Sequence, residues 1–348
     1  MTIGSKFRAR GWSPLKPVLV IPGLCSSCLV VTESPYDDWK GKQIWLNLGS
    51  IGFDKILLGN VMRNMRKRDD SRSNLNLEDS QKAQKRKWMQ HMRLKADGIS
   101  DPDGIKVRAM KGLKGCAYLE PHSVMHSLSY VMGPLFDTLK DAGYTSKNLK
   151  AAPYDWRLSP RMLEERDMYF TELKQMIQQL VADNKQKVVV LAHSLGTRVF
   201  HYFLLWIEDT AGRSWIDEKI DLWIPVGPLW LGAPKSIRAT VSGERMGLED
   251  FLYPEEGIEL TRFASSAWMF PTHTPDFEFQ EYSFLRDEKS GQHVAKNVMD
   301  IMRAGEVAVH CEIYDKHYKS DKYFVGPERL LKAPPIEKML AIYGVNLK

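Results

Sequence analysis

The sequence of 348 residues has few cysteines and no pattern that joins them. It contains four, too scattered for a disulfide-stabilised scaffold in a chain of this length: Cys25, Cys28, Cys116 and Cys311. Cys25 and Cys28 form a C-x-x-C pair, but no second ligand pair stands at the spacing that a zinc site needs. We therefore predict no metal centre and no cofactor. The low cysteine content also favours a reducing compartment.

The sequence lacks both an export signal and a membrane-spanning segment. No run approaches the roughly 18 consecutive apolar residues that a transmembrane helix needs. The N-terminal segment MTIGSKFRARGWSPLK is basic, but no uninterrupted apolar stretch or small-residue cleavage site follows it. We expect an intracellular protein whose contact with membranes is peripheral.

Excess positive charge is concentrated in one basic insert. Residues 63–95 hold eleven Lys or Arg against four Asp or Glu, a local charge of +7, whereas the whole chain carries +6. Two interpretations of this insert stay open: a solvated flexible loop, or a patch that binds anionic lipid head groups. Nucleic acid is not an expected partner, because aromatic residues are not interleaved with the basic ones. Trp88, Met89 and Met92 make the end of the insert the part expected to touch apolar matter.

Apolar strands alternate with amphipathic helices through the middle of the chain. Three segments are typical of buried strands: KPVLVIPG at 16–23, KVVVLAHS at 187–194 and IDLWIPVG at 220–227. Helices with one apolar face are predicted to begin at Ser159 and directly after Ser194. This alternation predicts an α/β fold with a mostly parallel sheet.

The pentapeptide AHSLG at 192–196 places Ser194 between a predicted strand and a predicted helix. A catalytic serine needs exposure on a sharp turn, a histidine to take its proton, and backbone donors for the developing oxyanion. Ala192 and Gly196 are small enough to let the strand and the helix approach closely on either side of the turn. The context predicts that Ser194 is a nucleophile, and a structural turn serine is the alternative.

Two backbone N–H groups are candidates for the oxyanion hole. Leu195 supplies one by its position directly after the serine. Leu24 supplies the other, because Pro22 and Gly23 turn the chain at the end of an earlier strand. His193 is expected to pack or to support the site rather than to take the proton.

Seven segments, in order along the chain, carry a family resemblance. They are IPGLCSS (21–27), IWLNL (44–48), AAPYDWRLSP (151–160), AHSLG (192–196), LGAP (231–234), FASSAWMFP (263–271) and APPIEKMLAIYGVNLK (333–348). Together they resemble the lecithin:cholesterol acyltransferase family, and the YDWRLSP stretch is similar to the phospholipid:sterol acyltransferases in particular. The resemblance spans nearly the whole chain apart from the basic insert.

This resemblance implies an α/β-hydrolase fold with an inserted cap and lid. It implies that Ser194 takes an acyl group from a phospholipid and passes it to a sterol, to another lipid alcohol or to water, with Leu24 and Leu195 as the oxyanion donors. Trp45 is expected near the lid or membrane-binding region. Asp155 and Arg157 form either a structural ion pair or a substrate contact.

On this basis the chain divides into five parts. The first core strand, the oxyanion loop and the lid or membrane-contact region occupy 1–62, and the basic insert occupies 63–96. The hydrolase core with the nucleophile turn occupies 97–234, and the cap occupies 235–332. A returning core strand occupies 333–348.

The sequence departs from the family pattern in the groups that would activate the serine. The family carries its aspartate in a GD-x-TVP type segment and its histidine beyond that, and no such segment occurs here. His201 is expected to pack on the helix after Ser194, and a pair formed by Asp315 and His317 falls in the cap. We expect instead a shortened form that lacks the acid and the histidine. The remaining internal candidates are His273, His293, His310, Asp300 and Asp321.

Two other functions stay open beside acyl transfer. The first is a phospholipase or lipid esterase of the same fold, because water can also resolve an acyl-enzyme. The second is a lipid-surface protein without catalytic activity, because the acid and the histidine are missing from the family pattern.

Overall fold

The computed structural model describes ten stretches of the chain. They are residues 2–45, 79–119, 130–243, 252–260, 263–272, 285–287, 291–293, 298–304, 308–324 and 332–344. No helix within these stretches combines the length and the apolar character that a bilayer crossing needs.

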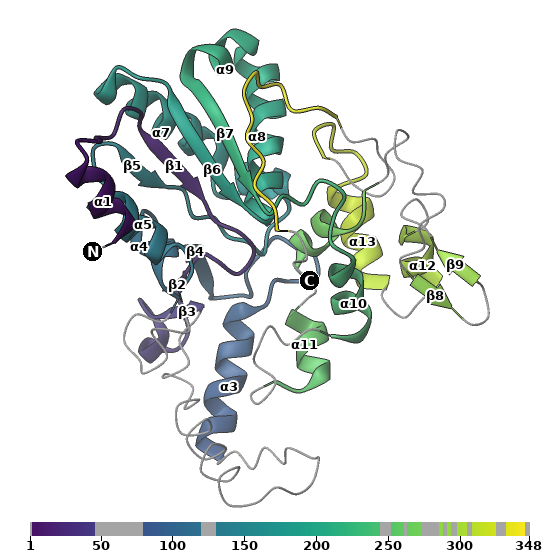
Figure 1. Cartoon of the computed structure of the whole chain (residues 1–348). Coiled ribbons are helices and arrows are strands. Elements are labelled where there is room, and N and C mark those ends of the chain that lie inside the picture. Colours follow the sequence, from purple (N-terminus) through teal and green to yellow (C-terminus); the bar gives the residue numbers. More distant parts are fainter. Residues whose placement is uncertain are drawn as a thin grey trace, which may run out of the picture.

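A parallel four-stranded sheet in the order β5-β1-β6-β7 forms the centre of the molecule (Figure 1). Its strands are β1 (Val18–Ile21), β5 (Leu149–Ala151), β6 (Val188–His193) and β7 (Ile220–Val226). Because all three pairings are parallel, the carboxyl ends of these strands meet at one edge. The predicted α/β class with a parallel sheet is therefore confirmed.

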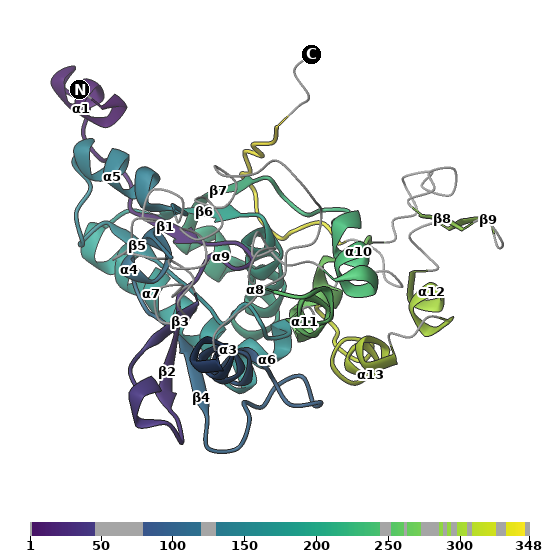
Figure 2. The same cartoon turned by 90° about the horizontal axis from the view of Figure 1, so that it is seen from below.

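The side chains of β1 alternate between two apolar cores, as strand geometry requires. Leu19 and Ile21 belong to the core that includes residues of α7 (Tyr169–Asn184) and α8 (Leu195–Ala211). Val18 and Val20 pack instead with Phe136 of α5 (Gly133–Asp141), near the short helix α4 (Lys114–Ala117). Helices therefore cover both faces of the sheet at β1 (Figure 2).

The two faces of β6 differ in burial. Val188 and Val190 are fully buried, whereas Val189 and Leu191 on the opposite face are half-buried. The helix after Ser194 follows its predicted apolar face, and the short helix α9 (Arg213–Lys219) leads from it to β7. The side chains of that face are fully buried: Val199, Phe200, Phe203, Leu204 and Ile207.

The helix predicted to begin at Ser159 is divided in two. The first part, α6 (Pro160–Glu165), ends before Met168, whose φ of +54° is left-handed. The carboxylate of Glu164 accepts the backbone N–H groups of Phe170 at 2.8 Å and Thr171 at 3.0 Å, so it caps the start of α7. The prediction of one continuous helix is wrong, although its apolar residues still face one core.

A separate three-stranded sheet, in the order β3-β2-β4, carries the described half of the basic insert. Its strands are β2 (Leu29–Glu33), β3 (Gln43–Trp45) and β4 (Lys106–Ala109), and the 3-10 helix η1 (Asp37–Trp39) joins β2 to β3. Helix α3 (Asp79–Met92) contacts β3 and β4 and hangs below the central sheet in Figure 1.

Helix α3 is packed against protein. Trp88, Met89 and Met92 are buried, and the indole N–H of Trp88 donates a hydrogen bond of 2.8 Å to the carbonyl of Ile44. The apolar end of the insert therefore does touch apolar matter, but within the protein core. For residues 79–95 the interpretation as a solvated loop is wrong, and residues 63–78 lie outside the described stretches.

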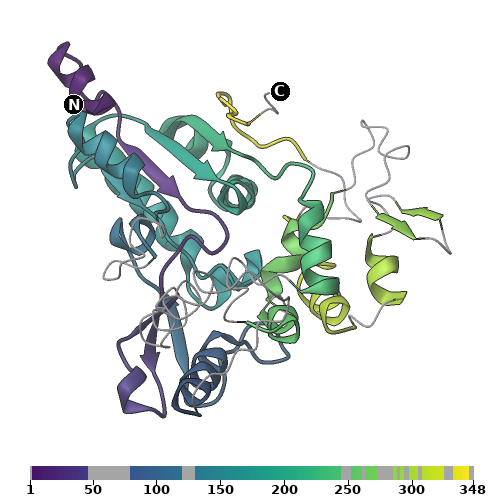
Figure 3. The ribbon, with the colours of Figure 1, turned by 60° about the horizontal axis from the view of Figure 1, so that its bottom comes forward.

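The elements that follow β7 lie at one end of the molecule, and α1 (Ile3–Ala9) lies at the other (Figures 1 and 3). They are α10 (Pro234–Ser242), α11 (Pro254–Leu260), η4 (Ala264–Met269), β8 (Leu285–Asp287), β9 (Gly291–His293), α12 (Val298–Ala304) and α13 (Ala308–His317). Contacts among them join α10 with α11 and with η4, α13 with α12 and with η4, and β8 with β9.

The segment predicted as a returning strand runs parallel to β7 without forming a continuous ladder. Two isolated bridges join Trp223 to Met339 and Val226 to Ile342. The amide of Gly227 also donates a hydrogen bond of 2.7 Å to the carbonyl of Ile342. The segment thus extends the sheet beyond β7.

Candidate active site

Ser194 lies on the sharp turn between β6 and α8. Its φ of +50° and ψ of −122° are rare for a residue with a side chain and occur mainly where the surrounding structure enforces them. Two hydrogen bonds fix this turn. The amide of Ser194 donates to the carbonyl of Val226 at 2.9 Å, and the hydroxyl of Thr197 donates to the carbonyl of Ser194 at 2.6 Å.

Two glycines let the loop after β1 lie directly against this turn. A Cβ atom at Gly196 would stand 2.3 Å from the carbonyl oxygen of Pro22, far inside van der Waals contact. A Cβ atom at Gly23 would stand 3.0 Å from Cβ of Ser194. The Pro22–Gly23 loop and the Ser194 turn are therefore neighbours at the same edge of the sheet.

A cavity of about 350 Å³ opens beside Ser194, which is partly exposed. Its wall is largely apolar, and the charged side chain along it is Lys235, the second residue of α10. A cavity of this kind excludes water from an apolar chain. The other lining residues are Leu24, Cys25, Trp156, Leu229, Ala233, Ser236, Ala239, Leu260, Phe263, Ser266 and Met269.

The two candidate oxyanion donors flank the turn. The amide of Leu195 begins α8, and neither it nor the amide of Leu24 donates to a backbone carbonyl in the described stretches. Cys25 holds the loop in a left-handed conformation, with φ of +55°. Its carbonyl accepts a hydrogen bond of 2.6 Å from the indole of Trp45. Trp45 is only 3% exposed, so it supports this loop from the interior.

Trp156 is a site residue whose role the sequence did not predict. It lines the cavity and stacks edge-on between Trp45 and Phe263, with ring centroids 5.0 and 5.2 Å away. Its indole N–H donates to the carbonyl of Ser27 at 3.1 Å. The sequence signal for this role is its position between Asp155 and Arg157 in the PYDWR motif. The motif alone does not show that Trp156 lines the cavity and that the two charged residues do not.

The described histidines do not bond to Ser194. The ring of His193 is partly buried and its Nδ1 has no hydrogen-bond partner within the described stretches; burial lowers its pKa. His317 contacts the carbonyl of Asp97 through Nε2 at 2.5 Å. His273 and the side chains of His293 and His310 lie outside the described residues.

The candidate acids after Ser194 are also engaged elsewhere. Asp300 and Asp315 both pair with Arg303, at 3.4 and 3.2 Å, and Asp321 accepts a hydrogen bond of 2.9 Å from Tyr202. Within the described stretches, the structure does not bring a carboxylate and an imidazole together at Ser194.

His201 packs in the interior, as the sequence predicts, and gives a test of stability against pH. Burial, helped by the charge of Arg198, lowers its pKa to about 4 although the Lys332 carbonyl accepts a hydrogen bond from it. As pH falls, the unfolded chain therefore protonates this histidine near pH 6.5, whereas the folded chain protonates it only near pH 4. The stability that the neutral ring permits is present above pH 6.5 and is lost as pH falls toward 4.

We expect this loss to reach about 3 kcal/mol of unfolding free energy, at about 1.4 kcal/mol per pKa unit. His201→Phe is expected to show a shallower fall between pH 6.5 and 4 than the wild type, measured by urea unfolding at each pH. Parallel curves for the two proteins would contradict the assignment.

Asp155 and Arg157 form a buried ion pair away from the Ser194 cavity. Arg157 donates to both carboxylate oxygens of Asp155, at 2.9 and 2.7 Å, and to Asp101 at 3.0 Å. It also donates to the carbonyls of His91 and Met92, both at 3.3 Å, so it caps the carboxyl end of α3. This geometry favours a structural ion pair over a substrate contact.

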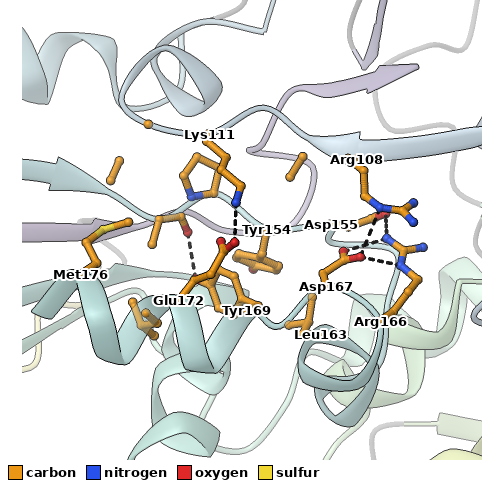
Figure 4. Close-up of a pocket in the computed structure, with 16 residues that line it drawn as sticks. Arg108, Lys111, Tyr154, Asp155, Leu163, Arg166, Asp167, Tyr169, Glu172 and Met176 are labelled. Atoms are coloured by element: carbon orange, nitrogen blue, oxygen red, sulfur yellow. Dashed lines mark hydrogen bonds and ion pairs between the residues drawn. The ribbon is translucent and has the colours of Figure 1, made fainter. Parts of the chain in front are cut away.

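Arg166 completes the pair from the other side and donates to Asp155 at 2.7 Å. Burial alone would raise the pKa of Asp155, but the charges of Arg157 and Arg166 outweigh it and hold that pKa well below its usual range. Figure 4 shows Asp155, Arg166, Asp167 and Arg108 together at one end of a second cavity, of about 320 Å³.

Comparison with known proteins identifies the family of this chain. The lecithin:cholesterol acyltransferase family profile matches residues 71–304. The chain therefore belongs to the lecithin:cholesterol acyltransferase family, in agreement with the sequence resemblance.

Several curated relatives are similar over part of their length. A phospholipid:diacylglycerol acyltransferase of Schizosaccharomyces pombe is 35% identical over 161 residues, which cover 45% of this chain and 24% of the relative. A phospholipid:diacylglycerol acyltransferase 1 of Arabidopsis thaliana is 31% identical over 248 residues, covering 69% of this chain and 32% of the relative. A phospholipid–sterol O-acyltransferase of Arabidopsis thaliana is 34% identical over 191 residues, covering 53% and 30%. The chain thus spans a minor part of each of these relatives.

Proposed function

We propose that this protein transfers a fatty acyl group from a phospholipid to a lipid alcohol through an acyl-enzyme on Ser194. The observation that carries the proposal is the position of Ser194 on an enforced left-handed turn that opens onto an apolar cavity. A hydroxyl held in this way is accessible to an ester carbonyl, while the cavity can hold the acyl chain.

The proposed first step forms a bond between Oγ of Ser194 and the carbonyl carbon of the phospholipid ester. The serine proton leaves with the lysophospholipid, and the amides of Leu24 and Leu195 stabilise the oxyanion. In the second step the hydroxyl of the acceptor attacks the acyl-serine and releases Oγ with its proton. The relatives' names support a phospholipid donor and either a sterol or a diacylglycerol acceptor.

We further propose that the central sheet is the core of an α/β-hydrolase fold. In this proposal residues 1–62 contain the oxyanion loop and a lid or membrane-contact region, 63–96 the insert, 97–234 the core and 235–332 the cap. Residues 333–348 continue the sheet beside β7.

Labelling with a fluorophosphonate tests the nucleophile. The reagent is added to the protein as it occurs in its native cells, and the modified residue is identified by mass spectrometry. We expect the label on Ser194, whereas Ser236 and Ser266 in the same cavity serve as internal controls and stay unmodified. A label on either control, or none, contradicts the proposal.

Product analysis tests the transfer step. The protein is incubated with acyl-labelled phosphatidylcholine and either a sterol or a diacylglycerol, and steryl ester, triacylglycerol and free fatty acid are separated. Accumulation of either ester supports the transferase. Free fatty acid alone would assign the protein as a phospholipase.

A second candidate function is lipid binding without catalysis. The observation that favours it is that no described histidine side chain bonds to Ser194. It predicts vesicle binding by a protein that fluorophosphonate does not label, so the same labelling experiment separates the two functions.

A further inference from the structure

The N-terminal fifteen residues of the described chain carry exposed apolar side chains among unpaired cations. Ile3, Phe7, Trp12 and Leu15 are 65%, 39%, 65% and 75% exposed. Lys6, Arg8 and Arg10 are exposed beside them, and none forms an ion pair within the described stretches. Residues 2–16 contain no Asp or Glu. We call these seven side chains the N-terminal patch.

The aromatic part of the patch is held in place by the backbone. Helix α1 ends at Ala9, and Gly11 follows its cap with a φ of +81°. The amide of Trp12 donates a hydrogen bond of 3.1 Å to the carbonyl of Phe7. This is the Schellman arrangement, which brings the side chain after the glycine back onto the helix. The rings of Phe7 and Trp12 lie 5.4 Å apart as a result. Two aromatic rings are thus fixed together on the surface.

Helix α1 is fixed to the body of the protein through α5. A Cβ atom at Gly4 would stand 2.0 Å from the carbonyl of Thr138, so α1 lies directly on α5. The hydroxyl of Thr2 also donates a hydrogen bond of 2.6 Å to Asp141. A surface that binds the patch therefore also anchors the part of the protein that packs against α1 through α5. Figures 1 and 2 place α1 at the edge of the molecule, beyond α5.

We propose that the N-terminal patch binds the surface of a bilayer that contains anionic lipids. Tryptophan favours the boundary between head groups and acyl chains, and Lys and Arg extend apolar stems there while their charges stay near the phosphates. A purely apolar surface is typical of a contact with another protein. The patch instead carries three cations on a segment without Asp or Glu, and these charges complement an anionic membrane.

The patch attaches the protein without forming part of the candidate active site. It precedes β1, whereas Ser194 and its cavity lie at the carboxyl ends of the strands. Binding to vesicles can therefore be measured without turnover, and it stands or falls separately from acyl transfer.

Cosedimentation of the full chain with phosphatidylcholine vesicles, with and without phosphatidylserine, tests the proposal. We expect binding to vesicles that contain phosphatidylserine, weakened by salt. Lys6→Gln/Arg8→Gln/Arg10→Gln is expected to weaken it about 100-fold, and Phe7→Ser/Trp12→Ser at least about tenfold. Matched controls are Lys40→Gln/Lys147→Gln/Lys185→Gln, which removes three exposed lysines elsewhere, and Met168→Ser, which removes an exposed apolar side chain; both should bind like the wild type.

Two outcomes would overturn the proposal. One is that the patch variants bind like the wild type, or that the controls lose binding equally. The other is that Phe7→Ser/Trp12→Ser dissolves a dimer in the absence of vesicles, which would assign the patch to a second copy of the chain. Fluorophosphonate labelling of Ser194 in the same variants should keep the wild-type rate, which separates this test from that of the nucleophile.

Discussion

Replacing Gly196 by alanine is expected to slow the acylation of Ser194 at least about 100-fold, the usual cost of losing one oxyanion donor. The added Cβ would stand 2.3 Å from the carbonyl of Pro22 and 2.7 Å from that of Ile21. Both contacts are backbone, so the loop after β1 or the start of α8 must move. That movement separates the amides of Leu24 and Leu195.

The rate of inactivation by a fluorophosphonate measures this effect. Alanine is a better helix former than glycine by about 1 kcal/mol, so a loss of rate or stability has to come from the contact and not from the helix. Gly344→Ala is the control, because a Cβ atom there meets no other atom within 4 Å. An unchanged inactivation rate in Gly196→Ala would remove the basis for placing an oxyanion donor at Leu24.

Arg157→Met is expected to lower the free energy of unfolding by about 3 to 5 kcal/mol, the usual cost of removing one partner from a buried ion pair. The change leaves Asp155 with Arg166 alone, removes a partner from Asp101, and uncovers the last carbonyls of α3. Urea unfolding at neutral pH measures the loss. Ser194 should keep its position in whatever fraction stays folded, because the pair does not line its cavity.

Arg213→Met is the matched control for this variant. Arg213 is 44% exposed and pairs with Asp217 at 3.1 Å within one helix, an arrangement worth about 0.5 kcal/mol or less. Arg157→Lys is expected to fall between the two, because an ammonium keeps the charge but cannot contact Asp155, Asp101 and the α3 carbonyls together. Equal losses for Arg157→Met and Arg213→Met would show that the buried pair has no special role.

The parts of the fold that the sequence predicts are those governed by local pattern. The strand before Ser194 and the helix after it follow from a continuous apolar run and from one apolar helical face. The break before α7 is different, because it depends on Glu164 bonding to amides six and seven residues ahead. The hydrogen bonds to Glu164 interrupt the helix without changing the spacing of the apolar residues. That spacing alone therefore predicts one continuous helix.

Long-range contacts explain what the sequence does not reveal about the insert. Trp88 is buried by β3, which lies more than forty residues earlier in the chain. The composition of residues 63–95 reports their charge but not this distant partner. The site shows the same division. The residues beside Ser194 on the turn follow from the local sequence, whereas the position of Trp156 depends on packing against Trp45 and Phe263, which are distant in the chain.

The hydrogen bond between the Trp45 indole and the Cys25 carbonyl joins the end of β3 to the loop after β1. Cys25 follows Leu24 directly, so a shift of the indole would tilt the peptide planes beside the proposed oxyanion donor. Trp45 is the last residue of β3, which belongs to the three-stranded sheet. The peptide beside the proposed oxyanion donor is therefore positioned by both sheets, because β1 of the four-stranded sheet precedes it in the chain and β3 of the other sheet holds it through the indole.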